Sequence, residues 1–287
     1  MADEELEDLR AVSDPMERAR RATELIDAKT ELIGEASAIR QDALEMLRDT
    51  VTHAEIAKGT GLTRARVSQL LGSARPERAL LAPEAGGVLT VAVVQKQDPG
   101  SGQPVIGSTT RRAVDTLKAA AQSFGIKSKE EEVAPPGMID LNRSNLAVMM
   151  GPRISALIAQ ALSADPVIRW RQDRRGRWYI TDAKTGTEYH SDFDEGWAGG
   201  PDDAERACFA HVGRVRRPDG HGTFLYLGGA HSPGTAGAVS YFTREMPALW
   251  DQVHRSAWSA VVRTVTGHDG GPATAELASP VYVHGRA

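Results

Sequence analysis

Two short runs of apolar residues constrain the fold of this chain more than any other feature. Residues 88–94 (VLTVAVV) and 146–150 (LAVMM) are almost continuously apolar, which indicates strands buried on both faces. Each run precedes a stretch with helical spacing of apolar residues, over residues 109–124 and 154–162. Strands that alternate with helices are typical of a mostly parallel sheet, so we expect an α/β domain.

Three shorter segments predict an antiparallel β-meander inserted into this domain. They cover residues 168–172, 177–181 and 187–190, and the sequences DRRG and DAKTG between them are typical of turns. The remaining predicted elements are strands over residues 126–131, 209–216, 223–227, 258–265 and 281–284 and a helix over residues 236–254.

A break in composition divides the chain. Residues 73–87 contain two prolines and two glycines and show no apolar period, which is typical of a linker. Before it, apolar residues recur at three-to-four spacing over residues 14–47, which predicts one or two amphipathic helices. We therefore expect an all-α domain over residues 1–72, a linker over residues 73–87 and an α/β domain over residues 88–287.

The net charge of −4 hides an uneven distribution. Residues 1–50 carry a net charge of −7, residues 51–80 carry +3, and the rest of the chain is neutral. Positive charge is thus concentrated in one short segment, as expected of a contact with DNA.

That segment contains the sequence THAEIAKGTGLTRARVSQLLG over residues 52–72, which resembles the helix-turn-helix of bacterial transcription regulators and sigma-factor-like proteins. In such a motif Ala54, Ile56 and Ala57 would face inward, and Gly61 would take the positive φ of the tight turn. The second helix would be anchored by an apolar set, Leu62, Val67 and Leu70.

The exposed side of the second helix would carry the residues that read DNA. Arginine can pair with guanine and glutamine with adenine, while serine and threonine can contact bases or phosphates. The predicted DNA-binding residues are Thr63, Arg64, Arg66, Ser68 and Gln69. The alternative is an ordinary helical hairpin with a solvated face.

Two glycine-rich turns follow predicted strands of the α/β domain. One is Gly151-Pro152-Arg153, and the other spans residues 228–235 and loosely resembles the phosphate-binding turn of Rossmann-like nucleotide-binding domains. Such turns lie at the carboxyl ends of parallel strands, where ligands bind, and a following helix favours anions. The predicted ligand-binding residues are Gly151, Pro152, Arg153, Gly229, His231, Ser232, Gly234 and Thr235. The alternative is that the glycines serve only tight turns and close packing.

The second turn also invites an enzymatic interpretation. Ser232 sits like the nucleophile of an α/β-hydrolase, but the next residue is Pro233, which has no N–H for an oxyanion hole. A nucleotide- or NAD-processing activity, as in a defence-type effector with a DNA-binding module, remains the open alternative. No catalytic residue, cofactor or metal site is predicted, because the histidines lack a ligand spacing and Cys208 is alone.

The chain as a whole resembles helix-turn-helix regulators of actinomycetes that have a Rossmann-like C-terminal domain. The resemblance lies in the order of four segments, which are a charged helical leader, ARVSQL, LNRSNLAVMMGPR and RRPDGHGTFLYLGGAH. The resemblance implies this architecture and a role in sequence-specific DNA binding and transcription regulation, but no particular ligand. The expectation that the α/β domain senses a small anionic ligand, which could be nucleotide-like, comes from the two glycine-rich turns. One recognition helix reads only a few base pairs, so we expect a homodimer on double-stranded DNA. An acidic start and the lack of a long apolar run predict a cytoplasmic protein without a membrane span.

Overall fold

The structure, a computed structural model, divides the chain into two compact units, Met1–Ala74 and Arg75–Ala287. It describes residues 2–47, 51–72, 77–82, 87–98, 100–194, 206–266 and 272–286. Most of the predicted linker, residues 73–76 and 83–86, lies outside these ranges. None of the described helices is both long and apolar enough to cross a bilayer.

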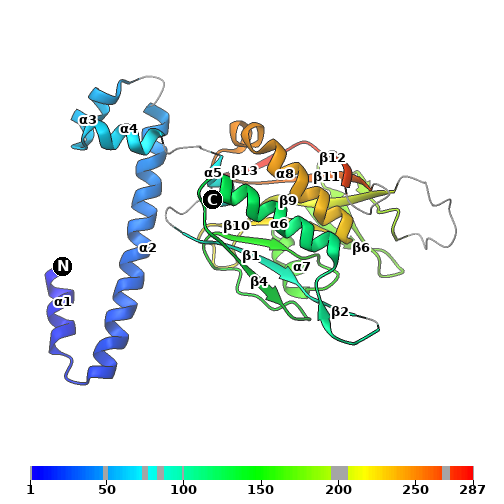
Figure 1. Ribbon diagram of the computed structural model, residues 1–287, viewed down its shortest axis with the longest axis horizontal. Helices are drawn as coiled ribbons and strands as arrows, with labels where there is room; N and C mark the ends of the chain where they lie inside the picture. The colour runs from blue at the N-terminus through cyan, green and yellow to red at the C-terminus, as the bar shows by residue number, and fades with distance from the viewer. Residues whose placement is uncertain are drawn as a thin grey trace. The chain divides into compact units, whose positions relative to one another are not determined.

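Unit 1 consists of helices in its described residues. They are α1 (Ala2–Ala11), α2 (Pro15–Leu47), α3 (His53–Thr60) and α4 (Arg64–Gly72). The amphipathic stretch forms one continuous helix of 33 residues, because the helix runs through Gly34 without a break. Figure 1 shows α1 returning beside the first half of α2, while α3 and α4 lie at the other end of that helix.

The main sheet of unit 2 is mixed. Its strands are β1 (Leu89–Val94), β4 (Ser128–Val133), β5 (Leu146–Met149), β9 (Ala207–Arg216), β10 (Thr223–Gly229), β11 (Ser256–Thr266), β12 (Pro272–Leu277) and β13 (Tyr282–Arg286). The spatial order is β12-β11-β9-β10-β5-β1-β4, and β13 pairs with β11. Strands β4, β1, β5 and β10 are parallel neighbours. The pairings of β9, β11, β12 and β13 are antiparallel.

The α/β fold is thus confirmed, with a parallel core and an antiparallel half that the sequence did not predict. Strand direction depends on which strands become neighbours, and β9 pairs with both β10 and β11 as an antiparallel partner. An apolar run such as that of β9 is compatible with either direction when both faces are buried.

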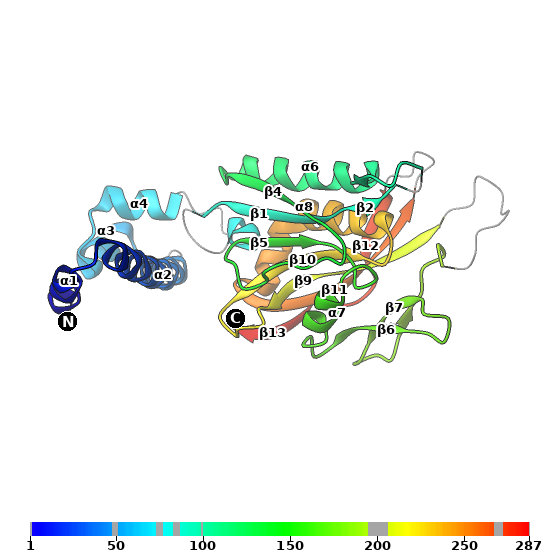
Figure 2. The same ribbon diagram turned by 90° about the horizontal axis from the view of Figure 1, so that it is seen from below.

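Helices cover both faces of the sheet. In Figure 2, α6 (Ser108–Ser123) and α8 (Ser232–Val253) lie together on one face, and α7 (Ala156–Leu162) lies on the other. The core beneath α6 and α8 includes Leu117, Leu225 and Phe242, all with no exposed surface. Both faces of β1 and β5 are buried, as the continuous apolar runs predicted.

The predicted meander is present as a separate antiparallel sheet of β6 (Ile168–Gln172), β7 (Trp178–Asp182) and β8 (Glu188–Tyr189). A short hairpin of β2 (Lys96–Gln97) and β3 (Pro104–Val105) follows β1.

Part of the predicted linker folds into unit 2. Residues Arg78–Leu81 form the short helix α5, and Leu80 and Leu81 are fully buried in the core beneath α6 and α8. The buried Arg214 donates from Nη2 to the carbonyl oxygen of Leu80 over 2.6 Å. The linker prediction was wrong for these residues, because a single turn is too short to show an apolar period.

Candidate functional site

Helices α3 and α4 enclose a small apolar core with the end of α2. Its buried residues are Leu44, Ile56, Val67 and Leu71, and Val51, Ala57, Leu62 and Leu70 pack against them. The inward orientation predicted for Ile56 and Val67 agrees with this core, whereas Ala54 is exposed, contrary to prediction. The prediction missed Leu44 and Leu71, which α2 and the last turn of α4 contribute.

Local sequence signals fix the ends of these two helices. Thr52 and Glu55 form a reciprocal capping box at the start of α3, and α3 ends at Gly61 with φ 71°. A positive φ suits glycine, so the tight turn follows from this residue. Thr63 Oγ1 accepts a hydrogen bond from the backbone N–H of Arg66 over 3.1 Å, as expected of a residue before the first turn of α4.

The residues predicted to read DNA share one property, which is exposure. Thr63, Arg64, Arg66, Ser68 and Gln69 are all exposed, while Val67 between them is fully buried. Arg66 Nη1 donates to Gln69 Oε1 over 2.7 Å, so these two side chains already form one polar pair. The arrangement presents a row of hydrogen-bonding groups to solvent on one short helix.

In unit 2 a cleft opens at the carboxyl ends of β1, β5 and β10. From β1 the chain passes through α6 to β4, which pairs with one edge of β1, whereas the next strand, β5, pairs with the other edge. The direction in which successive strands are added to the sheet therefore reverses at β1. Ligands in α/β sheets bind at such a point. The cleft is small, about 30 Å³. Its lining residues are Val94, Lys96, Gly107, Thr110, Met149, Met150, Gly151, Arg153, Ile154, Gly229, Ala230, His231, Ser232 and Thr235.

The structure brings together six of the eight predicted ligand-binding residues. Pro152 and Gly234 are buried and are not among the residues that line the cleft. The helix predicted to begin at residue 236 begins at Ser232, which places Ser232 and Thr235 in its first turn. Lys96 was missed, although its place just after the first buried strand could have indicated it.

The glycines of both turns have a packing role. A Cβ at Gly151 would lie 2.5 Å from the carbonyl oxygen of Gly229, and a Cβ at Gly234 would lie 2.9 Å from Cys208 Sγ. Thr235 also serves the fold, because its Oγ1 accepts a hydrogen bond from the N–H of Gly229 over 3.1 Å. Close packing therefore accounts for these glycines without a ligand.

Packing does not account for the two cations at the cleft. Lys96 Nζ donates to Ser232 Oγ over 3.0 Å, and Arg153 is exposed nearby. Partial burial and the positive charge of Arg153 together lower the pKa of Lys96. Among the described residues, neither cation forms an ion pair. Two like charges that share a cleft without a counter-ion favour a bound anion.

The starts of two helices add to this positive potential. Gly107 precedes α6 and His231 precedes α8, and among the described residues no side chain caps either helix. The helix dipole favours an anion at both positions. The contribution of N–H groups is smaller at α8, because Pro233 in its first turn has none.

His231 contacts the chain segment that follows β8. Its Nε2 lies 2.8 Å from Asp194 Oδ1, and its ring lies 5.7 Å from that of Phe193. The carboxylate therefore compensates any positive charge on this histidine, and His231 contributes shape to the cleft more than charge.

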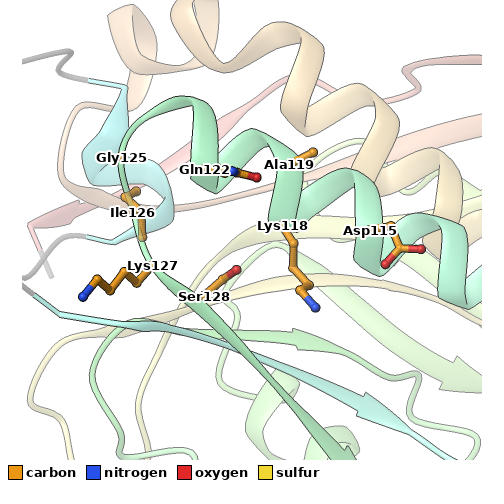
Figure 3. Close-up of a pocket in the computed structure, with 8 residues that line it drawn as sticks. All are labelled: Asp115, Lys118, Ala119, Gln122, Gly125, Ile126, Lys127 and Ser128. Carbon is orange, nitrogen blue, oxygen red and sulfur yellow. The ribbon is translucent and has the colours of Figure 1, made fainter.

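A larger groove, about 680 Å³, lies at the other end of the parallel strands, between α6 and the start of β4 (Figure 3). Lys118 points from α6 toward β4 in Figure 3 and lies 3.6 Å from Glu130. Lys127 also lines the groove. This groove is at the amino ends of the strands, so it lacks the convergence of helix starts found at the cleft.

No group of three or more histidine, cysteine or acidic residues able to hold a metal ion occurs in the described part of the chain. No protein-family model matches the sequence, and neither the curated proteins nor the solved structures gave a match.

Proposed function

We propose that this chain is a sequence-specific DNA-binding transcription regulator. The observation that carries the proposal is the exposed polar row on α4, anchored by the buried Val67 behind it and preceded by the turn at Gly61. A helix with this exposed side fits the major groove, where Arg64 and Arg66 could reach guanine and Gln69 could reach adenine. The local excess of positive charge supports the same contact through the phosphates.

The test is to select a preferred duplex from random DNA and to measure binding to it. Replacing both Arg64 and Arg66 by alanine should cost about 1–3 kcal/mol for each arginine that reads a base, and should relax sequence preference. Arg10→Ala with Arg18→Ala is the matched control, since it also removes two exposed positive charges, both outside α4. Equal binding by the wild type and the double variant across salt concentrations would refute the proposal.

We further propose that the cleft of unit 2 binds the anionic group of a small, nucleotide-like ligand. The uncompensated pair of Lys96 and Arg153 supports this, together with the uncapped starts of α6 and α8. A cleft of about 30 Å³ is too small for a whole nucleotide, so at most part of the charged group would enter it and the rest of the ligand would lie outside. To regulate DNA binding, the ligand must bind the DNA-binding form of the protein and its inactive form with different affinity. A typical coupling between two such sites changes the affinity for DNA by about 5- to 150-fold.

Calorimetry with inorganic phosphate and with nucleoside mono- and diphosphates tests this second proposal. The double variant Lys96→Ala and Arg153→Ala should weaken binding roughly tenfold or more, because a charge-assisted hydrogen bond is lost at each position. The matched control is Lys118→Ala with Lys127→Ala in the groove of Figure 3. Binding that is absent, or that the cleft variant leaves unchanged, would refute an anion site. Turnover of any nucleotide would instead support the enzymatic alternative.

A further inference from the structure

The antiparallel hairpin of β6 and β7 carries a concentration of positive charge. Residues 168–178 (IRWRQDRRGRW) contain five arginines and one acidic residue, Asp173, for a net charge of +4. Residues 81–287 as a whole are neutral, so this charge is local. Figure 2 shows the two strands at the margin of unit 2, outside the main sheet. We name residues 168–178 the basic hairpin.

One face of the basic hairpin is packed against the rest of unit 2. Ile168 of β6 and Ile180 of β7 are buried in one cluster with Val261 of β11. Side chains alternate between the two faces of a strand, so Arg169 and Arg171 of β6 lie on the opposite face. The packed face holds the hairpin in place, and the position of these arginines is therefore set by the fold.

The turn between the two strands adds two more exposed cations, Arg174 and Arg175. Asp173 Oδ1 accepts hydrogen bonds from the backbone N–H groups of Arg175 and Arg177 over 2.8 and 2.9 Å. Asp173 Oδ2 accepts another from Nε of Arg177 over 2.7 Å. The carboxylate is thus occupied within the turn, and its ion pair is with Arg177.

The other four arginines have no counter-ion. Among the residues that the structure describes, no ion pair is formed by Arg169, Arg171, Arg174 or Arg175. The Nε atom of Arg169 is buried and has no hydrogen-bond partner in the same part of the chain. An ordinary solvated surface intersperses charges of both signs. Four cations without partners on one hairpin instead favour a polyanionic partner.

The chemistry of the basic hairpin favours duplex DNA over other polyanions. Duplex DNA carries one charge for about every 1.7 Å of its axis, twice the density of a single strand, so it complements clustered cations best. Arginine also suits phosphate, because its planar guanidinium can donate two hydrogen bonds to one phosphate group. An anionic membrane is less suitable, since residues 168–190 expose no large apolar side chain that could insert.

We propose that the basic hairpin is a second DNA contact, which binds the phosphates of duplex DNA without regard to sequence. The inference rests on the proposed function for the choice of partner, because a chain that reads duplex DNA through α4 tethers unit 2 to the same duplex. The two contacts differ in chemistry. Helix α4 would read base edges, whereas the hairpin would add affinity through the backbone.

The salt dependence of duplex binding by the full chain tests the proposal. Each cation that neutralises a phosphate adds about 0.9 to the slope of log affinity against log salt concentration. The triple variant Arg171→Ala, Arg174→Ala and Arg175→Ala should lower that slope by up to about 2.7. At about 0.1 M salt it should also weaken binding roughly tenfold or more, and by the same factor for every duplex sequence.

Two further variants are the controls. Arg10→Ala with Lys127→Ala and Lys129→Ala removes three exposed positive charges outside the hairpin and should leave the slope nearly unchanged. Replacing the three hairpin arginines by lysine retains their charge and should retain most of the slope. The turn should persist in each variant, because Asp173 accepts from backbone N–H groups. Thermal unfolding of each variant verifies that unit 2 is folded.

A triple alanine variant with the slope of the wild type would overturn the proposal, as would a charge control that lowers the slope equally. A variant that loses binding to single strands but keeps its binding to duplex DNA would overturn it too. The function proposed for α4 fails separately. Arg64→Ala with Arg66→Ala should remove the sequence preference and leave the share of the slope that the hairpin supplies, whereas the hairpin variant should keep the preference and lose that share.

Discussion

Lys96 Nζ donates a hydrogen bond to Ser232 Oγ over 3.0 Å, and this bond joins the segment after β1 to the first turn of α8. The two residues are 136 positions apart in the sequence. Their contact brings a cation to the start of a 22-residue helix, where an anion would gain from both. The positive charge of the cleft is thus a property of the fold itself.

The first prediction concerns the proton affinity of Lys96. Its pKa is lowered by burial and by the charge of Arg153, so Arg153→Ala should raise the pKa of Lys96 toward its ordinary value. Side-chain NMR of lysine-labelled protein would follow the titration. Phosphate binding should weaken as pH rises through this lowered pKa, because the ammonium loses its charge. An unchanged titration in the variant would show that the two cations do not interact.

The second prediction concerns the close approach of two strand ends. Gly151→Ala would place a Cβ 2.5 Å from the carbonyl oxygen of Gly229, so it should lower the free energy of unfolding of unit 2 by about 1–3 kcal/mol. Gly107→Ala is the control, since it lines the same cleft and a Cβ there meets nothing within 4 Å. Urea unfolding of both variants measures the difference. Equal stability would contradict the role assigned to Gly151.

The same geometry decides which variants can probe the ligand. A side chain at Gly234 would collide with Cys208 Sγ, so Gly234→Val should disturb the fold as much as the cleft. The pair Lys96 and Arg153 is the cleaner probe, because neither side chain belongs to the packed core.

The third prediction concerns the capping box of α3. Thr52 Oγ1 accepts from the N–H of Glu55, and Glu55 Oε2 accepts from the N–H of Thr52 over 3.0 Å. Thr52→Ala should cost unit 1 about 1 kcal/mol, within the usual 0.5–2 for such caps. Thr23→Ala on the exposed side of α2 is the control. Thermal unfolding followed by circular dichroism would detect this loss of stability. If Thr52→Ala were as stable as Thr23→Ala, the capping box would not contribute to the stability of unit 1.

The fourth prediction concerns a buried carboxylate in unit 2. Asp165 Oδ2 lies 3.5 Å from His211 Nε2, and Asp165 Oδ1 lies 3.7 Å from His284 Nε2. Burial acts to raise the pKa of Asp165, but the two histidines and the N–H of Val167 outweigh it, so the pKa lies below its ordinary value. The carboxylate therefore stabilises the fold above about pH 4, and this stabilisation is lost as pH falls further.

Asp165→Asn should accordingly lower the free energy of unfolding near pH 7 by about 1–3 kcal/mol, because it replaces a buried acceptor of several polar contacts with an amide that can satisfy only some of them. The difference in the free energy of unfolding between the wild type and the variant should become smaller when unfolding is measured below pH 4. Asp115→Asn, at an exposed position, controls for the loss of one charge. If this difference in free energy did not change with pH, the ionised form of Asp165 would not be what stabilises the fold.

Much of the fold could be predicted because apolar patterning records burial directly. The runs at β1 and β5, the period of α6 and the alternation of the meander all gave elements close to those observed. Strand β12 was missed because its sequence, PATAEL, has one buried residue and no apolar alternation. The direction of β9 was missed because pairing partners are a property of the whole sheet.

The candidate site was predictable where chemistry and local structure coincide. Arg64 and Arg66 follow a recognisable turn, and Arg153 follows a buried strand, so the sequence was enough to select them as candidates. Lys96 lies in a short hairpin whose position over the cleft depends on long-range packing, and only the structure brings it to Ser232. The glycine-rich turns do lie at the cleft, but packing alone requires Gly151 and Gly234, so these glycines are not evidence of a ligand.

The burial of Leu80 and Leu81 determines where the chain can be cut. A fragment that began at residue 88, the start of the α/β domain expected from composition, would lack α5 and would leave a hole in the core beneath α6 and α8. Arg214 would also lose the carbonyl oxygen of Leu80 as an acceptor. A fragment that begins at Arg75 retains both, so domain-swap fusions and crystallisation of the isolated unit should start there, and limited proteolysis should spare the peptide bonds of α5.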